Sequence, residues 1–151
     1  MIKDKIEILF IHIVLPLFLG GIIYLIFRSP KLLMFKWVKC IGIYYYLYEL
    51  RIYFLPLKKN LSEWFLYTLP NTLWIYSFTS YMIVIWESTN RNLIKFFCIL
   101  LPLILGIISE ILQLLQIIPG TFDKIDLLFC FIGSGISISY FYKRKEKNYE
   151  I

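Results

Sequence analysis

Four polar side chains stand close together in one stretch of an otherwise apolar chain, where they could do chemistry. Glu110 and Gln113 interrupt a hydrophobic run, and Asp123 and Asp126 follow shortly after it. Carboxylate and amide groups bind polar ligands through hydrogen bonds, so all four are predicted binding residues. Glu110 and Asp126, if brought together, would share a proton or hold a cation. This pair is therefore the candidate for acid and base catalysis.

The composition predicts that these residues lie in a membrane. Of the 151 residues, 60% are hydrophobic and only 17% are charged, and the mean hydropathy is +0.72. A soluble domain of this length is less apolar, so the sequence predicts one membrane domain over residues 1–151. The expected fold class is all-α, a polytopic transmembrane helix bundle.

Four stretches are long and apolar enough to be predicted spans, because a helix needs roughly 20 residues to cross about 30 Å of hydrocarbon. They are residues 6–27, 69–86, 93–118 and 125–142. Residues 31–68 are rich in Trp, Tyr and Lys and are expected to form an interfacial or re-entrant segment. The alternative is five spans, with residues 40–57 crossing as well. Glu49 and Arg51 would then need partners in or near the membrane.

Basic residues orient the chain. With four spans, Lys and Arg residues divide evenly between the two sides of the membrane. Five spans would place more of them in the cytoplasm, and the positive-inside rule modestly favours that arrangement. In both arrangements the basic tail after Tyr142 places the C-terminus in the cytoplasm. The polar residues then lie towards the outer leaflet of a bacterial cytoplasmic membrane.

A helix over residues 93–118 would gather its polar side chains on one face. At 100° per residue, these are Ser109, Glu110, Gln113 and Gln116. Glu110 would lie about 12 Å inside the end of such a helix. A purely structural alternative has Glu110 and Gln113 joining helices through hydrogen bonds, with Asp123 and Asp126 as the N-cap and N3 residues of the last helix.

Two segments resemble the VanZ-like family. The run "SEILQLLQIIPGTFDKIDLLFCFIG" resembles the C-terminal half of that family, and "LPNTLWIYSFTSYMIVIW" resembles the "LPDGLW" helix of one branch. Asn71 and Thr72 stand where Asp and Gly are commoner. The resemblance covers about residues 64–140 and implies a small polytopic bacterial membrane protein. It adds Asn71 and Trp74 to the predicted binding residues.

Other residue types indicate packing rather than chemistry. Gly133 and Gly135 alternate with serines and predict close contact between helices. His12 is expected to be a packing residue, and the three cysteines lack metal-ligand spacing. No metal or cofactor is expected. Membrane lipids are the expected partners, with another membrane protein or a second copy of the chain as alternatives, and no nucleic acid is expected.

Three functions are compatible with these observations. The first is an envelope protein that binds or handles an amphiphilic lipid or lipid-linked glycan at the outer leaflet. The resemblance links such a role to teicoplanin resistance, because the founding VanZ-like protein is associated with low-level resistance to this lipid-bearing glycopeptide. The second is an intramembrane enzyme in which Glu110 and Asp126 act as acid and base. The third is a helper subunit or assembly factor, and the sequence leaves open whether any reaction is catalysed.

Overall fold

The protein is described by a computed structural model over residues 6–30, 32–89, 91–118 and 120–149, and all regular structure in these residues is helical. Three helices are long and apolar enough to cross a membrane: Ile6–Phe27, Asn92–Leu114 and Lys124–Lys145. The first consists of a π-helical start, η1 (Leu9–Val14), continued by α2 (Leu15–Phe27). The other two lie in α6 (Asn92–Leu114) and α7 (Lys124–Tyr149). An all-helical fold with several candidate membrane spans is therefore confirmed.

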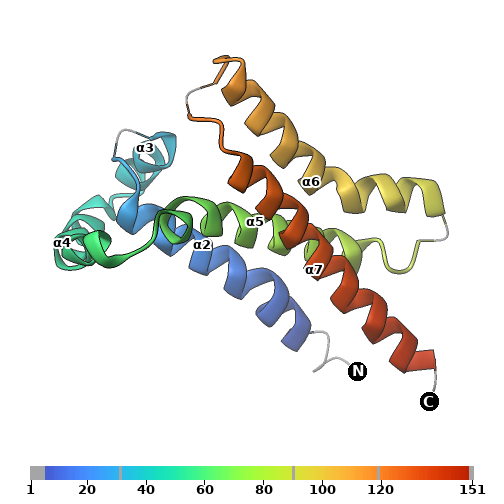
Figure 1. Ribbon diagram of the computed structural model, residues 1–151. Coiled ribbons are helices and arrows are strands. Elements are labelled where there is room, and N and C mark those ends of the chain that lie inside the picture. The colour runs from blue at the N-terminus through green and yellow to red at the C-terminus, as the bar shows by residue number, and fades with distance from the viewer. Residues whose placement is uncertain (1–5, 31, 90, 119, 150–151) are drawn as a thin grey trace.

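The predicted count of four spans is not confirmed. The span expected at residues 69–86 falls within α5 (Glu63–Ile85), which is 23 residues long but less apolar than the three candidate spans. Figure 1 shows α5 between α2 and α6, with α7 crossing it. Its buried side chains include Thr68, Ser77, Thr79 and Ser80. Because protein surrounds much of α5, hydroxyl groups can occupy positions that lipid would require to be apolar.

Hydroxyl groups of α5 bond to the neighbouring helices. Ser80 Oγ lies 2.9 Å from Ser137 Oγ of α7, and Ser77 Oγ donates to the carbonyl oxygen of Ile13 at 2.7 Å. Tyr76 OH lies 2.5 Å from His12 Nδ1, so His12 is bonded within the bundle as expected of a packing residue. Each of these pairs joins residues more than fifty positions apart in the chain.

α5 and α7 approach each other closely at Gly133. A Cβ atom added there would lie 2.8 Å from the carbonyl oxygen of Thr72, whereas one added to Gly135 would meet nothing within 4 Å. Ser134 and Ser137, on the same side of α7 as Gly133, are almost fully buried. The predicted close contact is thus made by Gly133 and its neighbouring serines, and Gly135 takes no part in it.

Between α2 and α5 the chain forms short helices, at the end of the bundle where α2 ends (Figure 1). They are α3 (Leu33–Cys40), α4 (Tyr44–Phe54) and the 3-10 helix η2 (Leu55–Asn60), before α5 begins at Glu63. The 11 residues of α4 rise only about 16 Å, roughly half of the hydrocarbon thickness. No helix between residues 32 and 62 is among the candidate spans, so the structure gives no support to the five-span alternative. Placement of this segment at the membrane surface stays a prediction.

Arg51 attaches α4 to α2. It is buried and donates hydrogen bonds to the carbonyl oxygens of Leu25 and Arg28, the latter at 2.8 Å, and its guanidinium lies 4.9 Å from the centre of the Phe35 ring. These carbonyls belong to the last turn of α2, where no helical N–H is available to them. Burial lowers the pKa of Arg51, but arginine starts so far above neutral pH that it stays charged.

Candidate functional site

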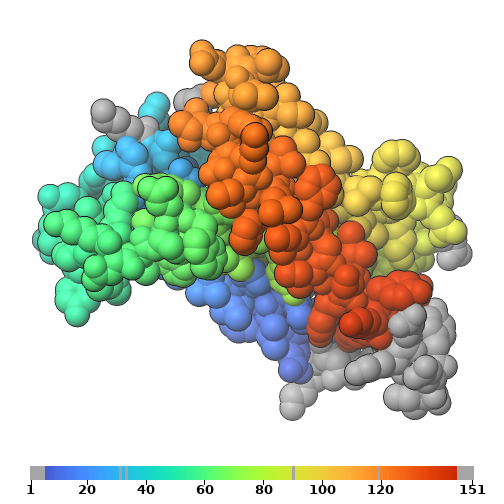
Figure 2. Space-filling model, in the orientation of Figure 1, coloured from blue at the N-terminus to red at the C-terminus, as the bar shows by residue number. Residues whose placement is uncertain are grey.

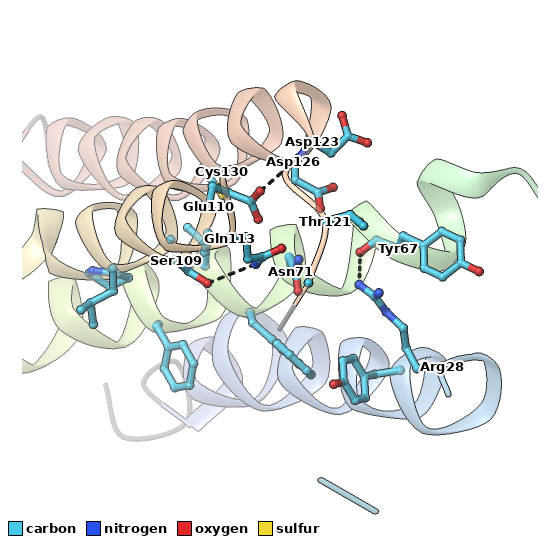
Figure 3. A pocket seen from close by; sticks show the side chains of 18 of the residues that line it. Arg28, Tyr67, Asn71, Ser109, Glu110, Gln113, Thr121, Asp123, Asp126 and Cys130 are labelled. Carbon is cyan, nitrogen blue, oxygen red and sulfur yellow. Dashed lines mark hydrogen bonds between the residues drawn. The ribbon is translucent and has the colours of Figure 1, made fainter. Parts of the chain in front are cut away.

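A cavity of about 1100 Å³ lies between α2, α5, α6 and the start of α7 (Figure 3). All six residues predicted to bind a ligand line it: Asn71, Trp74, Glu110, Gln113, Asp123 and Asp126. The structure therefore brings together side chains from α5, α6, α7 and the connection between α6 and α7. That connection projects at one end of the molecule and is coloured orange in Figure 2.

The α6 wall of the cavity changes from apolar to polar along the helix. Leu101 and Leu105 line its first part, and Ser109 and Gln113 line its last part. Gln113 follows Leu101 by twelve positions, which is a rise of about 18 Å. The polar end of the α6 wall therefore lies near the start of α7.

The α5 wall changes in the same spatial direction. Met82 and Phe78 line its C-terminal part, Trp74 its middle, and Asn71 and Tyr67 its N-terminal part. Because α5 runs opposite to α6, as Figure 1 shows, the apolar parts of both walls face each other and so do the polar parts. The cavity thus has one apolar end and one polar end.

Two buried carboxyl groups form part of the polar end. Glu110 is 4% exposed, and its Oε2 accepts a hydrogen bond from the backbone N–H of Asp123 at 3.3 Å. Asp126 is 8% exposed, and its Oδ1 accepts a hydrogen bond from the Thr68 hydroxyl at 2.5 Å. Each carboxyl group is therefore held by a donor from a different element.

Asp123 caps α7, as the structural alternative predicted. Its Oδ1 accepts a 2.8 Å hydrogen bond from the N–H of Ile125, in the first turn. In a capping box the side chain at N3 accepts a hydrogen bond from the backbone N–H of the N-cap residue. Here the N3 residue, Asp126, accepts its hydrogen bond from Thr68 instead. Glu110 accepts that N–H from another helix. The predicted role of Asp123 as the N-cap is therefore confirmed. The predicted role of Asp126 is wrong, because Glu110 on α6 accepts the N–H that an N3 side chain would accept in a capping box.

The predicted polar stripe of α6 is one residue too long. The helix ends at Leu114 rather than at residue 118, and Gln116 follows in a turn with φ of 57°. Gln116 is exposed and does not line the cavity. Glu110 consequently lies about 6 Å from the end of its helix, half the predicted depth. Pro119, part of the predicted turn, lies outside the described residues.

Gln113 and Ser109 contact each other along α6. Gln113 Nε2 donates to Ser109 Oγ at 3.5 Å, and the Gln113 side chain covers Gly120 so closely that a Cβ atom there would collide with it. The amide therefore closes the cavity against the α6–α7 connection.

Arg28 is the principal cavity residue that sequence reasoning missed. Its Nη2 donates to the carbonyl oxygen of Tyr67 at 3.3 Å, and the guanidinium carbon lies 4.7 Å from the centre of the Tyr67 ring. Its Nε is buried and has no hydrogen-bond partner among the described residues. The sequence shows Arg28 only as a charge after an apolar span, and no local pattern connects it to Tyr67 or to Glu110.

No group of three or more His, Cys, Asp or Glu side chains suited to a metal ion occurs within the described ranges. The arrangement can instead bind an uncharged or charged polar group through Glu110, Asp126, Gln113, Asn71 and Arg28. Comparison with protein-family models, with curated proteins and with solved structures finds no match to this chain.

Proposed function

We propose that this chain is a multi-pass membrane protein of the bacterial envelope that binds an amphiphilic molecule, a lipid or a lipid-linked glycan, in the cavity between α2, α5, α6 and α7. The observation that supports the proposal most directly is that two walls of the cavity change from apolar to polar in the same direction. Both α5 and α6 line the cavity with apolar side chains at one end and polar side chains at the other. An amphiphile has the same division between its chain and its headgroup.

The apolar part of the cavity wall is open enough for a hydrocarbon chain to reach it from the bilayer. Leu105 is 56% exposed and Phe78 is 47% exposed, although both line the cavity. Exposed apolar side chains that gather in one place mark a surface suited to lipid or to a ligand. A lipid chain can therefore occupy this part of the cavity while its headgroup lies among the polar residues.

The proposal takes α5 as a fourth span. Its 23 residues rise about 34 Å, enough to cross the hydrocarbon. An even number of spans brings the start of the first helix and the end of the last to one side, and Figure 1 shows the first helix beginning and α7 ending at the same end of the bundle. The basic residues after Tyr142 favour the cytoplasm for that side. The polar end of the cavity then lies in the outer leaflet.

The resemblance to the VanZ-like family supports an envelope role. Teicoplanin carries a lipid chain and is itself an amphiphile. We therefore expect production of the wild-type chain in a susceptible Gram-positive host to raise the teicoplanin concentration needed for growth inhibition. Leu105→Trp, which narrows the apolar part of the cavity, should abolish that increase.

One observation favours a second candidate, an intramembrane enzyme acting on the bound lipid. Glu110 and Asp126 are both buried, and both line the same cavity as the proposed ligand. An acid and a base are needed for most transfers of a headgroup, and two carboxyl groups can supply them. Glu110→Gln would then lose conversion even at a saturating lipid concentration, whereas a pure binding protein has no conversion to lose.

A helper subunit is less well supported by the geometry. A helper subunit would bury its polar side chains against another protein, whereas Glu110 and Gln113 line a cavity within the chain itself. Co-purification of a stoichiometric partner protein would support the helper-subunit hypothesis.

Native mass spectrometry of the protein purified in mild detergent tests the proposal. Wild-type protein should retain about one amphiphile per chain, and Leu105→Trp should lose most of it. Ile108→Trp is the matched control, because Ile108 is also exposed on α6 but does not line the cavity. Equal retention by the two variants, or no retained amphiphile in the wild type, would contradict the proposal.

A further inference from the structure

The charged groups around the cavity are not paired with one another. Glu110 and Asp126 are 4% and 8% exposed, and within the described part of the chain neither forms an ion pair. The donors that reach them are a backbone N–H and a hydroxyl, both neutral. A buried carboxylate without a cation is costly, so a ligand that brings a positive charge would be bound strongly there.

Arg28 presents the opposite charge across the cavity. Figure 3 shows Arg28 facing the cavity from α2, on the other side from Glu110 and Asp126. Its single hydrogen bond within the described residues goes to a carbonyl oxygen, and its buried Nε has no partner. The Tyr67 and Tyr24 rings, 4.7 and 5.6 Å from the guanidinium carbon, hold the group in place. A guanidinium with free donors is suited to a phosphate or a carboxylate.

We infer that the ligand of this cavity is a zwitterionic amphiphile, with a protonated primary amine that binds Glu110 and Asp126 and an anionic group that binds Arg28. This inference rests on the proposed function and adds the chemical class of the headgroup. The two signs of charge come from different elements, α6 and α7 on one side and α2 on the other. A ligand with only one sign of charge would leave one side of the cavity without a counter-charge.

The primary amine is specified by the hydrogen-bonding capacity of the carboxylates. Glu110 and Asp126 can each accept further bonds, and a primary ammonium has three N–H donors. A quaternary ammonium carries the same charge but no donor. The structure therefore predicts that a phosphoethanolamine-type headgroup is preferred over a phosphocholine-type headgroup, and that both are preferred over an anionic headgroup without an amine.

Lipid titrations of the full chain, followed by native mass spectrometry, test the inference. The probes are phosphatidylethanolamine, phosphatidylethanolamine acetylated on its nitrogen, and phosphatidylglycerol, all with the same acyl chains. The wild type should bind phosphatidylethanolamine at least about tenfold more tightly than either of the other two, because a charge-assisted hydrogen bond is lost with the amine. The acetylated lipid makes this comparison without any change to the protein.

Variants then assign the two charges. Glu110→Gln should weaken phosphatidylethanolamine binding and leave phosphatidylglycerol binding unchanged, so that the preference falls towards one. Arg28→Gln should weaken both lipids, because both carry a phosphate. Glu87→Gln is the control, since Glu87 is exposed in the connection between α5 and α6 and does not line the cavity.

The outcomes separate the two proposals. Saturable binding of all three lipids with equal affinity overturns the zwitterionic headgroup but leaves amphiphile binding standing. Absence of saturable binding by any lipid overturns amphiphile binding and this inference with it. The assigned role of Glu110 is refuted if Glu110→Gln keeps the wild-type preference for the lipid with the amine. The melt of this variant shows whether it is folded, which this comparison requires.

Discussion

Replacing Gly133 by alanine should destabilise the bundle, because this residue is where α7 approaches the backbone of α5. An added Cβ atom would lie 2.8 Å from the Thr72 carbonyl oxygen and 3.2 Å from the Thr72 methyl group. Gly135, two residues further along α7, has nothing within 4 Å of such an atom and is the matched control.

The magnitude follows from two opposing effects. Relieving the contact at Gly133 requires the backbones to separate by roughly 0.7 Å, since favourable contacts between heavy atoms begin near 3.5 Å, and overpacking of this kind costs about 1–3 kcal/mol. Alanine also favours helix over glycine by about 1 kcal/mol, and this gain applies at both positions. Gly133→Ala should therefore lower the free energy of unfolding by up to about 2 kcal/mol, whereas Gly135→Ala should leave it unchanged or raise it by up to about 1 kcal/mol.

Cys130 provides the assay. Its thiol is 4% exposed on α7, so it should react with a thiol-specific dye only after the helices separate. Cys40 and Cys98 are replaced by serine to remove other signals. The melting temperature of Gly133→Ala should be the lowest of the three proteins. A Gly133→Ala protein that melts at or above the temperature of Gly135→Ala would refute the close approach of α5 and α7.

Three further substitutions test individual contacts. Arg51→Met should release α4 from α2, with a loss of about 1.5–3 kcal/mol for hydrogen bonds to a charged group, and should speed tryptic cleavage of the Lys58–Lys59 bond in η2 through local unfolding. Arg51→Lys should show a smaller effect, and equal cleavage rates would contradict this. Asp123→Ala should cost about 1 kcal/mol through loss of the α7 cap, and Asp123→Asn should restore it, as measured by the Cys130 melt. Thr68→Val should cost about 1–3 kcal/mol, because it leaves buried Asp126 without its hydroxyl donor; an unchanged melt would refute that contact.

Hydropathy predicted the fold class because three of the long helices contain an apolar stretch long enough to cross a membrane. It also predicted a span at residues 69–86, but α5 is less apolar than the three candidate spans. Its hydroxyl groups have a structural reason, because Ser77 and Ser80 bond to neighbouring helices, and a single segment of sequence does not reveal such contacts. Short helices such as α4 were not predictable in detail, since Arg51 finds its partners on α2, more than twenty residues earlier in the chain.

The candidate site was predictable in part. Helical spacing placed Ser109, Glu110 and Gln113 on one face of α6, and the structure keeps them in one cavity. The end of α6 was not predictable, because no residue in this apolar run indicates that Gln116 adopts a positive φ. Arg28 was missed because its position opposite the carboxylates depends on the packing of α2 against α5.

Photocrosslinking from the cavity wall tests amphiphile binding most directly. A photoreactive amino acid at Leu105, in the cavity, is compared with one at Ile108, which is exposed on the same helix outside it. The protein in detergent is titrated with phosphatidylethanolamine and irradiated. If the cavity binds an amphiphile, labelling from residue 105 should saturate at about one lipid per chain and be displaced by excess unlabelled lipid, whereas labelling from residue 108 should rise without saturation. Labelling that rises in parallel at both positions, without saturation, would contradict amphiphile binding in the cavity.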